Sequence, residues 1–199
     1  MTVVVLGFGA FLEVTDNPAS HLATAVHGLG RRITIVGAEM PASYARGHAV
    51  AAEAMARHNP VLLLGVGVAR GRTLAMVERT AFAEVSVADP DVDGDFGEIA
   101  GATAGATAGA LTGALTGATA GPISLESPVA TALAAALELP VSDDAGRYVC
   151  NAWLYRALRG GFPAAFLHVP PQGWPVEALI DGLERWATIR ERRAFLAGA

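Results

Sequence analysis

The stretch Thr2-Val-Val-Val-Leu6, followed at once by Gly7-Phe-Gly9, gives the first indication of the fold. An uninterrupted run of β-branched and apolar residues that ends at glycine is typical of a strand buried on both faces. Such strands occur mainly in parallel sheets that helices cover on both sides. The stretch therefore favours an α/β protein.

Outward from this strand, strand and helix patterns alternate along the chain. Further strands are predicted at 32–36, 61–65, within 74–87, at 140–142 and at 164–168, and helices at 17–28, 41–58, 128–137, 145–158 and 176–196. Because strands that alternate with helices form parallel βαβ units, we expect one domain over residues 1–199. It should have three layers, with a mostly parallel, twisted sheet and helices on both faces.

Composition narrows the class of protein. Of the 199 residues, 52% are apolar and 17% are charged, which favours a compact, well-buried chain over a disordered one. The net charge is −5 and no basic block occurs, so nucleic acid and anionic membranes are poor candidate partners. No apolar run reaches the length of a membrane span, and the N-terminal run lacks the features of a secretory signal. With one cysteine and no internal disulfide, we expect a cytoplasmic protein.

A glycine repeat interrupts the alternation. Glycine recurs every four residues from Gly101 to Gly121, and no charged residue occurs between 99 and 125. The segment at about 99–122 is either a low-complexity insertion without a specific role or a tightly packed element or subunit contact. A membrane helix of the GxxxG type is disfavoured, because glycine and threonine make the segment too weakly apolar.

Three residues could support thiol chemistry. Cys150 stands near the start of a predicted helix, where unpaired N–H groups favour a thiolate and should lower the pKa of the thiol. His168 ends a predicted strand, and functional groups in α/β sheets gather beyond the carboxyl ends of strands. Glu78 lies in an apolar run and could accept the imidazole N–H.

Each of these residues also has a structural interpretation. Cys150 could be a small core residue, and His168 could bond to a neighbouring loop. Glu78 could form a salt bridge with Arg79 or occupy a solvent-facing strand position.

Four separated motifs resemble those of the pyroglutamyl peptidase I family, the pyrrolidone-carboxylate peptidases of cysteine peptidase family C15. They are Gly7-Phe-Gly-Ala-Phe11 with Asn17-Pro18, Gly71-Arg72 with Glu78-Arg-Thr-Ala81, Ser142-Asp-Asp-Ala-Gly-Arg-Tyr-Val-Cys-Asn151, and Phe166-Leu-His-Val-Pro170. The cysteine motif is the most specific of the four. Their order and rough spacing hold over nearly the whole chain.

The resemblance implies a phosphorylase/hydrolase-like α/β domain that removes N-terminal pyroglutamate from peptides through a thioacyl-enzyme. It implies Cys150 as nucleophile, His168 as base and Glu78 as the residue that orients the base. It places the substrate, a small peptide with a blocked N-terminus, at Phe8, Phe11, Asn17, Val68 and Tyr148. No metal or cofactor is implied, and a homo-oligomer, either a dimer or a tetramer, is expected.

The chain departs from the family pattern at several polar positions. Ala10 replaces a proline, Val68 a pocket glutamine, and Ala83 an asparagine, while Ala88 falls near an expected arginine. A catalytically impaired relative that serves as a binding or assembly module is therefore one alternative. A dinucleotide-binding domain is another, because glycines follow the first strand and Glu39 follows the second.

Overall fold

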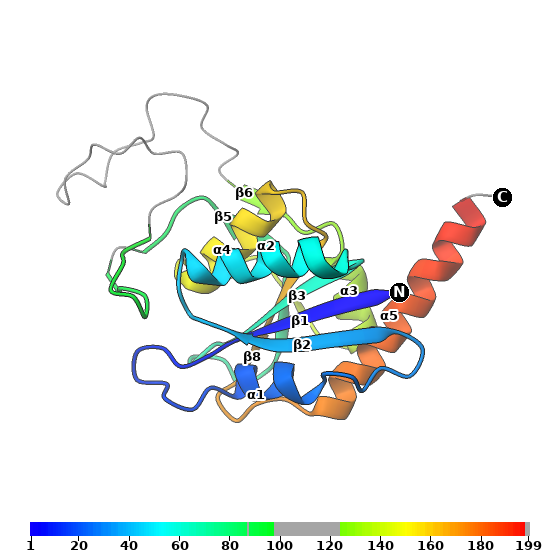
Figure 1. The fold of residues 1–199 in the computed structure, drawn as a ribbon, viewed down its shortest axis with the longest axis horizontal. Helices are drawn as coiled ribbons and strands as arrows, with labels where there is room; N and C mark the ends of the chain where they lie inside the picture. The colour runs from blue at the N-terminus through cyan, green and yellow to red at the C-terminus, as the bar shows by residue number, and fades with distance from the viewer. Residues whose placement is uncertain (87, 98–123, 198–199) are drawn as a thin grey trace.

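The computed structural model describes residues 1–86, 88–97 and 124–197 (Figure 1), so the predicted insertion at about 99–122 lies outside the described residues. The apolar run at the N-terminus forms β1 (Thr2–Phe8), which lies between β2 (Thr34–Met40) and β3 (Leu62–Val68) and is parallel to both. The side chains of its central residues are almost completely buried. The prediction of a buried parallel strand is thus confirmed.

Three further strands complete the main sheet. They are β8 (Ala164–Val169), β4 (Met76–Glu78) and β7 (Val141–Ser142), and the strand order is β2-β1-β3-β8-β4-β7. Every neighbouring pair is parallel except β4 and β8, which are antiparallel. A separate two-stranded antiparallel sheet joins β5 (Thr80–Phe82) to β6 (Ser124–Glu126). The sequence predicted two strands at most within 74–87, and β4 and β5 are those two; β6 was not predicted.

Helices cover both faces of the main sheet, as Figure 1 shows. One face packs against α1 (Pro18–Ala25), α3 (Ala130–Leu137) and α5 (Val176–Ala197). The other packs against α2 (Arg46–His58) and α4 (Val149–Arg159). The expected three-layer, mostly parallel α/β domain is therefore confirmed. Within the described ranges, no helix combines the length and apolar character that crossing a membrane requires.

Two helices begin four or more residues later than predicted, each for a local reason. The helix expected from 41 begins at Arg46, because β2 continues to Met40 in register with Phe8 of β1. The helix expected from 145 begins at Val149, because Gly146 has a φ of +80°, which no helix accommodates. This late start puts Cys150 in the first turn of α4.

The glycines after the first strand serve packing rather than nucleotide binding. A Cβ at Gly7 would collide with the backbone of Ala19, so glycine there lets α1 approach β1 closely. β1 ends at Phe8 and α1 begins only at Pro18, so no helix N-terminus follows directly on the glycines. The geometry does not support the dinucleotide-binding alternative.

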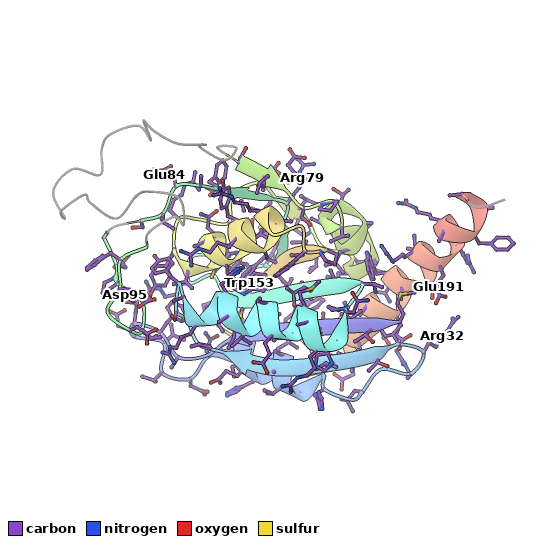
Figure 2. The ribbon with its side chains drawn as sticks, turned by 45° about the horizontal axis from the view of Figure 1, so that its top comes forward. Arg32, Arg79, Glu84, Asp95, Trp153 and Glu191 are labelled. Carbon is purple, nitrogen blue, oxygen red and sulfur yellow. The ribbon has the colours of Figure 1, made fainter. Side chains whose placement is uncertain are left out.

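Close packing also brings α4 down onto β3. A Cβ at Gly65 would lie 2.7 Å from the Trp153 ring and closer still, 2.5 Å, to the ring of Phe166. Figure 2 shows Trp153 inside the molecule near α2, and its indole N–H donates to the carbonyl of Gly47 at 3.2 Å. The first turn of α4 is thereby held directly over the sheet.

Candidate active site

Cys150 is the second residue of α4, and its thiol lies over β3. A Cβ at Gly67 would be 3.0 Å from the Cys150 Sγ, and Gly67 pairs with His168 of β8. Partners in adjacent parallel strands present their side chains to the same face of a sheet. The thiol and the imidazole therefore lie beside each other on the face that α2 and α4 cover.

His168 is oriented by Glu78. The imidazole Nδ1 lies 2.8 Å from the Glu78 Oε1, and the Glu78 side chain has no exposed surface. The imidazole also packs edge-on against the ring of Phe166, with 4.9 Å between ring centres. With Nδ1 directed at the carboxylate, Nε2 is left as the nitrogen that can exchange a proton with the thiol.

A fourth side chain, Arg72, contacts the same carboxylate. Its Nη1 donates to the Glu78 Oε1, and its Nη2 donates to the Ser142 hydroxyl at 3.2 Å and to the carbonyl of Asp144 at 2.8 Å. Arg79 pairs instead with Asp143, at 2.7 Å, so the alternative of a salt bridge between Glu78 and Arg79 is wrong. The sequence contained a signal for Arg72, the Gly71-Arg72 motif, but its spacing alone gave the arginine no role.

The surroundings of the Cys150 thiol favour its neutral form. Burial raises the pKa of Cys150 to about 12, the negative charge of Glu78 adds to this effect, and the backbone N–H of Cys150 only partly opposes it. The position at a helix N-terminus had predicted a lowered pKa, so that expectation is wrong. A reactive thiolate at neutral pH therefore requires proton transfer to a base such as His168.

A small apolar pocket lies beside the thiol. Its lining residues are Phe8, Phe11, Ala42, Gly67, Val68, Tyr148, Val149 and Cys150. Four of the five predicted substrate-binding residues are among them. The rings of Phe11 and Tyr148 lie 6.1 Å apart, and the Tyr148 hydroxyl donates to the carbonyl of Pro90 at 2.8 Å. Shape and apolar contact thus dominate what the lining side chains offer a ligand.

The fifth predicted residue, Asn17, lies behind this wall. It is 3% exposed, its amide donates to the carbonyl of Gly9 at 2.8 Å, and its oxygen accepts from the N–H of Ala19 at 3.0 Å. These bonds cap α1 and fix the loop that carries Phe11. The structure therefore gives Asn17 a supporting position outside the pocket.

Asn151, beside the nucleophile, was not predicted as a site residue. Its side-chain oxygen accepts from the N–H of Phe82 at 2.8 Å, and its amide donates to the carbonyls of Phe82 and Glu84, both at 2.9 Å. It ties the first turn of α4 to β5 and the loop that follows. The Cys150-Asn151 pair in the motif was the available signal for this role.

No metal site accompanies this arrangement in the described part of the chain. Over residues 1–86, 88–97 and 124–197, no three His, Cys, Asp or Glu side chains are grouped as a bound ion would require.

Comparison with known proteins places the chain in a family. The family model described as pyroglutamyl peptidase matches residues 1–171, a range that includes Glu78, Cys150 and His168. The chain belongs to the pyroglutamyl peptidase family. It is 32% identical over 179 residues to a pyrrolidone-carboxylate peptidase of Mycobacterium marinum, covering 88% of this chain and 73% of the relative. It is 29% identical over 209 residues to mouse pyroglutamyl-peptidase 1, covering 99% and 92%.

Solved structures of pyroglutamyl peptidases share the fold. A mutant pyrrolidone carboxyl peptidase of the hyperthermophile Pyrococcus furiosus has a TM-score of 0.72 at 21% identity, covering 97% of this chain and 99% of its own. Pyroglutamyl peptidase I of Bacillus amyloliquefaciens has a TM-score of 0.73 at 22% identity, covering 94% of this chain and 93% of its own. The similarity in fold therefore extends over almost the whole chain.

Proposed function

We propose that this chain is a cysteine peptidase that removes N-terminal pyroglutamate from peptides. The observation that carries the proposal is the grouping of Cys150, His168 and Glu78 beside an apolar pocket, in a member of the pyroglutamyl peptidase family. Relatives named as pyroglutamyl or pyrrolidone-carboxylate peptidases support the substrate class. Nothing in this geometry favours the alternative of an impaired relative.

The first half-reaction forms a thioacyl-enzyme. The Cys150 sulfur attacks the carbonyl carbon that joins the pyroglutamyl residue to the next residue, while the His168 Nε2 takes the thiol proton. Glu78, 2.8 Å from Nδ1, stabilises the imidazolium that results. The C–N bond then breaks, His168 returns the proton to the leaving amine, and the shortened peptide departs.

The second half-reaction restores the thiol. Neutral His168 takes a proton from a water molecule as that water attacks the thioester carbon. The C–S bond breaks, the proton passes to the sulfur of Cys150, and pyroglutamate is released. No oxidant, metal or cofactor takes part in either half-reaction.

Backbone N–H groups at the start of α4 would stabilise the oxyanion. Tyr148, the residue at the helix cap, makes no side-chain capping bond, which leaves the first-turn N–H groups available to a ligand. Donors aimed at a developing oxyanion typically contribute about 10²–10³-fold in rate.

The walls of the pocket would select a flat, five-membered acyl ring. Phe8, Phe11 and Tyr148 supply aromatic surface, and Val68 completes an apolar lining. We therefore propose Phe8, Phe11, Val68 and Tyr148 as substrate-contacting residues, with Asn17 supporting the loop that carries Phe11.

We also propose that the enzyme is a cytoplasmic homo-oligomer. A reducing compartment keeps a catalytic thiol from oxidation.

The end of α5 projects beyond the sheet (Figure 1). Phe195 and Leu196 there are 77% and 74% exposed, and this apolar surface is suited to contact with a second copy of the chain. Light scattering after size exclusion, compared between the wild type and Phe195→Ser, tests the assembly.

Mass-spectrometric screening of N-terminally blocked peptides tests the proposed reaction. Matched peptides that begin with pyroglutamate, proline, an acetylated residue or a formylated residue are incubated with the wild type. Release of free pyroglutamate and of the shortened peptide is expected from the first peptide. Cleavage of an acetylated or formylated peptide instead would identify a different acyl hydrolase.

A further inference from the structure

Arg72 is outside the three residues assigned to the reaction, yet it bonds to one of them directly. Its Nη1 donates to the Oε1 of Glu78, the same oxygen that faces the Nδ1 of His168. Its Nη2 bonds to Ser142 at the end of β7 and to the carbonyl of Asp144, in the segment that leads to Cys150. The Arg72 side chain thus connects Glu78 with the segment that precedes Cys150.

The burial of Glu78 makes this connection consequential. The Glu78 side chain is completely buried, and its Oε2 has no hydrogen-bond partner among the described residues. A buried carboxylate remains charged only when nearby cations and donors replace the lost water. Arg72, 26% exposed, can supply that compensation from the edge of the site.

Three titratable or charged groups face this carboxylate in the described part of the chain. They are Arg72 from the loop between β3 and β4, His168 from β8 and Cys150 from α4. Imidazole and thiol both exchange protons during the proposed reaction. Of the three, only the guanidinium keeps its positive charge throughout.

We propose that Arg72 is a positioning residue that keeps Glu78 anionic and ties it to the segment preceding Cys150. While Glu78 is an anion, the proton that His168 takes from the thiol stays on the imidazole and is available to the leaving amine. Without Arg72, this proton would spend part of its time on the Glu78 carboxylate instead of on the imidazole. The kinetic readout of this inference rests on the proposed function, whereas thiol reactivity provides a readout that needs no substrate.

The test is the pH dependence of kcat/KM in an Arg72→Met variant. In the proposed mechanism, the acid side of the pH profile reports whether Nε2 of His168 is free to accept the thiol proton. Removing a nearby positive charge makes a buried, negatively charged pair hold its proton more strongly. The acid limb is the part of the profile in which kcat/KM rises with pH, and its midpoint is expected to move up by about one pH unit or more. The value of kcat on the plateau should fall.

Conservative and matched variants separate charge from packing. Arg72→Lys retains the positive charge and should leave the midpoint near that of the wild type. Arg72→Gln retains hydrogen bonding without charge and should shift the midpoint of the acid limb as Arg72→Met does. It replaces Arg72→Met in the test if that variant fails to fold. Arg79→Met removes a surface arginine one residue from Glu78 (Figure 2), whose ion pair is with Asp143, and should shift nothing.

A double-mutant cycle locates the effect. In a Glu78→Gln background, which has no carboxylate to compensate, Arg72→Met should not move the limb further. An unshifted limb in folded Arg72→Met and Arg72→Gln would overturn the proposal and leave Arg72 a structural support only. The same limb shift in Arg79→Met would also overturn it, because the effect would then be a general one of surface charge.

Alkylation of the single cysteine by iodoacetamide keeps this inference separate from the proposed function. The rate of modification of Cys150 is measured against pH in the wild type and the Arg72 variants, with no peptide present. If the wild type cleaves no pyroglutamyl peptide, the proposed function fails. If the pH midpoint of the rise in alkylation rate is higher in Arg72→Met than in the wild type, the positioning role is still supported. An unchanged midpoint would refute it.

Discussion

Replacing Gly67 by alanine should displace the nucleophile while the fold persists. The added methyl would lie 3.0 Å from the Cys150 Sγ and 3.0 Å from the Phe166 Cζ. Non-bonded heavy atoms rest at about 3.5–4.0 Å. The thiol or the methyl must therefore give way by roughly 0.5–1 Å.

The displacement sets the size of the effect. A misplacement of about 1 Å in a reacting group can cost about 10²-fold in rate, so Gly67→Ala should lower kcat/KM by roughly 10–100-fold. Overpacking of a filled core costs about 1–3 kcal/mol, which lowers the Tm of a chain of this length by roughly 3–10 °C. The variant should thus lose most of its kcat/KM while remaining folded at the assay temperature.

Gly65→Ala is the matched control, two residues earlier on the same face of β3. Its methyl would lie 2.5 Å from Phe166 and 2.7 Å from Trp153, both buried rings that cannot move aside. This variant should lose more stability than Gly67→Ala, although it is farther from the thiol. The assay combines kcat/KM on a pyroglutamyl reporter substrate with thermal unfolding of both variants. A folded Gly67→Ala protein with activity within twofold of the wild type would refute the placement of the thiol over β3.

Three further predictions address the nucleophile, the pocket and a buried carboxylate away from the site. Cys150→Ser should abolish hydrolysis without lowering Tm by more than a few degrees, since the hydroxyl is a poorer nucleophile than the thiolate; residual turnover near the wild-type rate would exclude Cys150 as the nucleophile. Val68→Gln should raise kcat/KM for pyroglutamyl substrates more than for carbocyclic analogues, because an amide can pair with the lactam N–H and C=O; equal changes for both would show that other groups read the ring. Burial alone would raise the pKa of Glu184, but the backbone N–H groups of residues 31–33 outweigh it and lower that pKa below its ordinary value of 4.5. The stability that Glu184 contributes is therefore present above about pH 4.5 and lost progressively as pH falls below it. Glu184→Gln should flatten the fall of Tm in that acid range, and an unchanged slope would contradict this assignment.

The sequence predicted most of the sheet and both helical layers because their patterns are local. The runs that form β1, β3 and β8 are almost entirely apolar apart from Thr2 and His168, which is typical of parallel strands covered by helices on both faces. β6 was missed because three residues, Ser124–Glu126, show no periodicity and acquire strand geometry only by pairing with β5. The start of α4 was misplaced because a left-handed glycine inside an apparent helix cannot be distinguished from a tolerated one.

The motifs proposed the residues of the site, but they could not indicate the environment of those residues. Cys150, His168 and Glu78 were named from motifs, and the structure brings them together. The pKa of the thiol was predicted in the wrong direction, because the helix N-terminus is visible in sequence whereas burial is not. Arg72 had no predicted role because two of its partners, Ser142 and Asp144, are 70 and 72 residues away.

The reversed direction of β4 governs which changes of chain length this scaffold could tolerate. Antiparallel pairing sets Met76 opposite His168 and Glu78 opposite Phe166, so Glu78 lies two residue pairs along the ladder from the pair that contains His168. Extra residues beside Leu74, which is 67% exposed, would lengthen a surface loop at a cost that grows only slowly. One residue inserted within β4 would instead exchange the faces of Val77 and Glu78 and direct the carboxylate into the apolar layer beneath α3. A redesign of this enzyme can thus change the length of that loop, but it must keep the three-residue length of β4 unchanged.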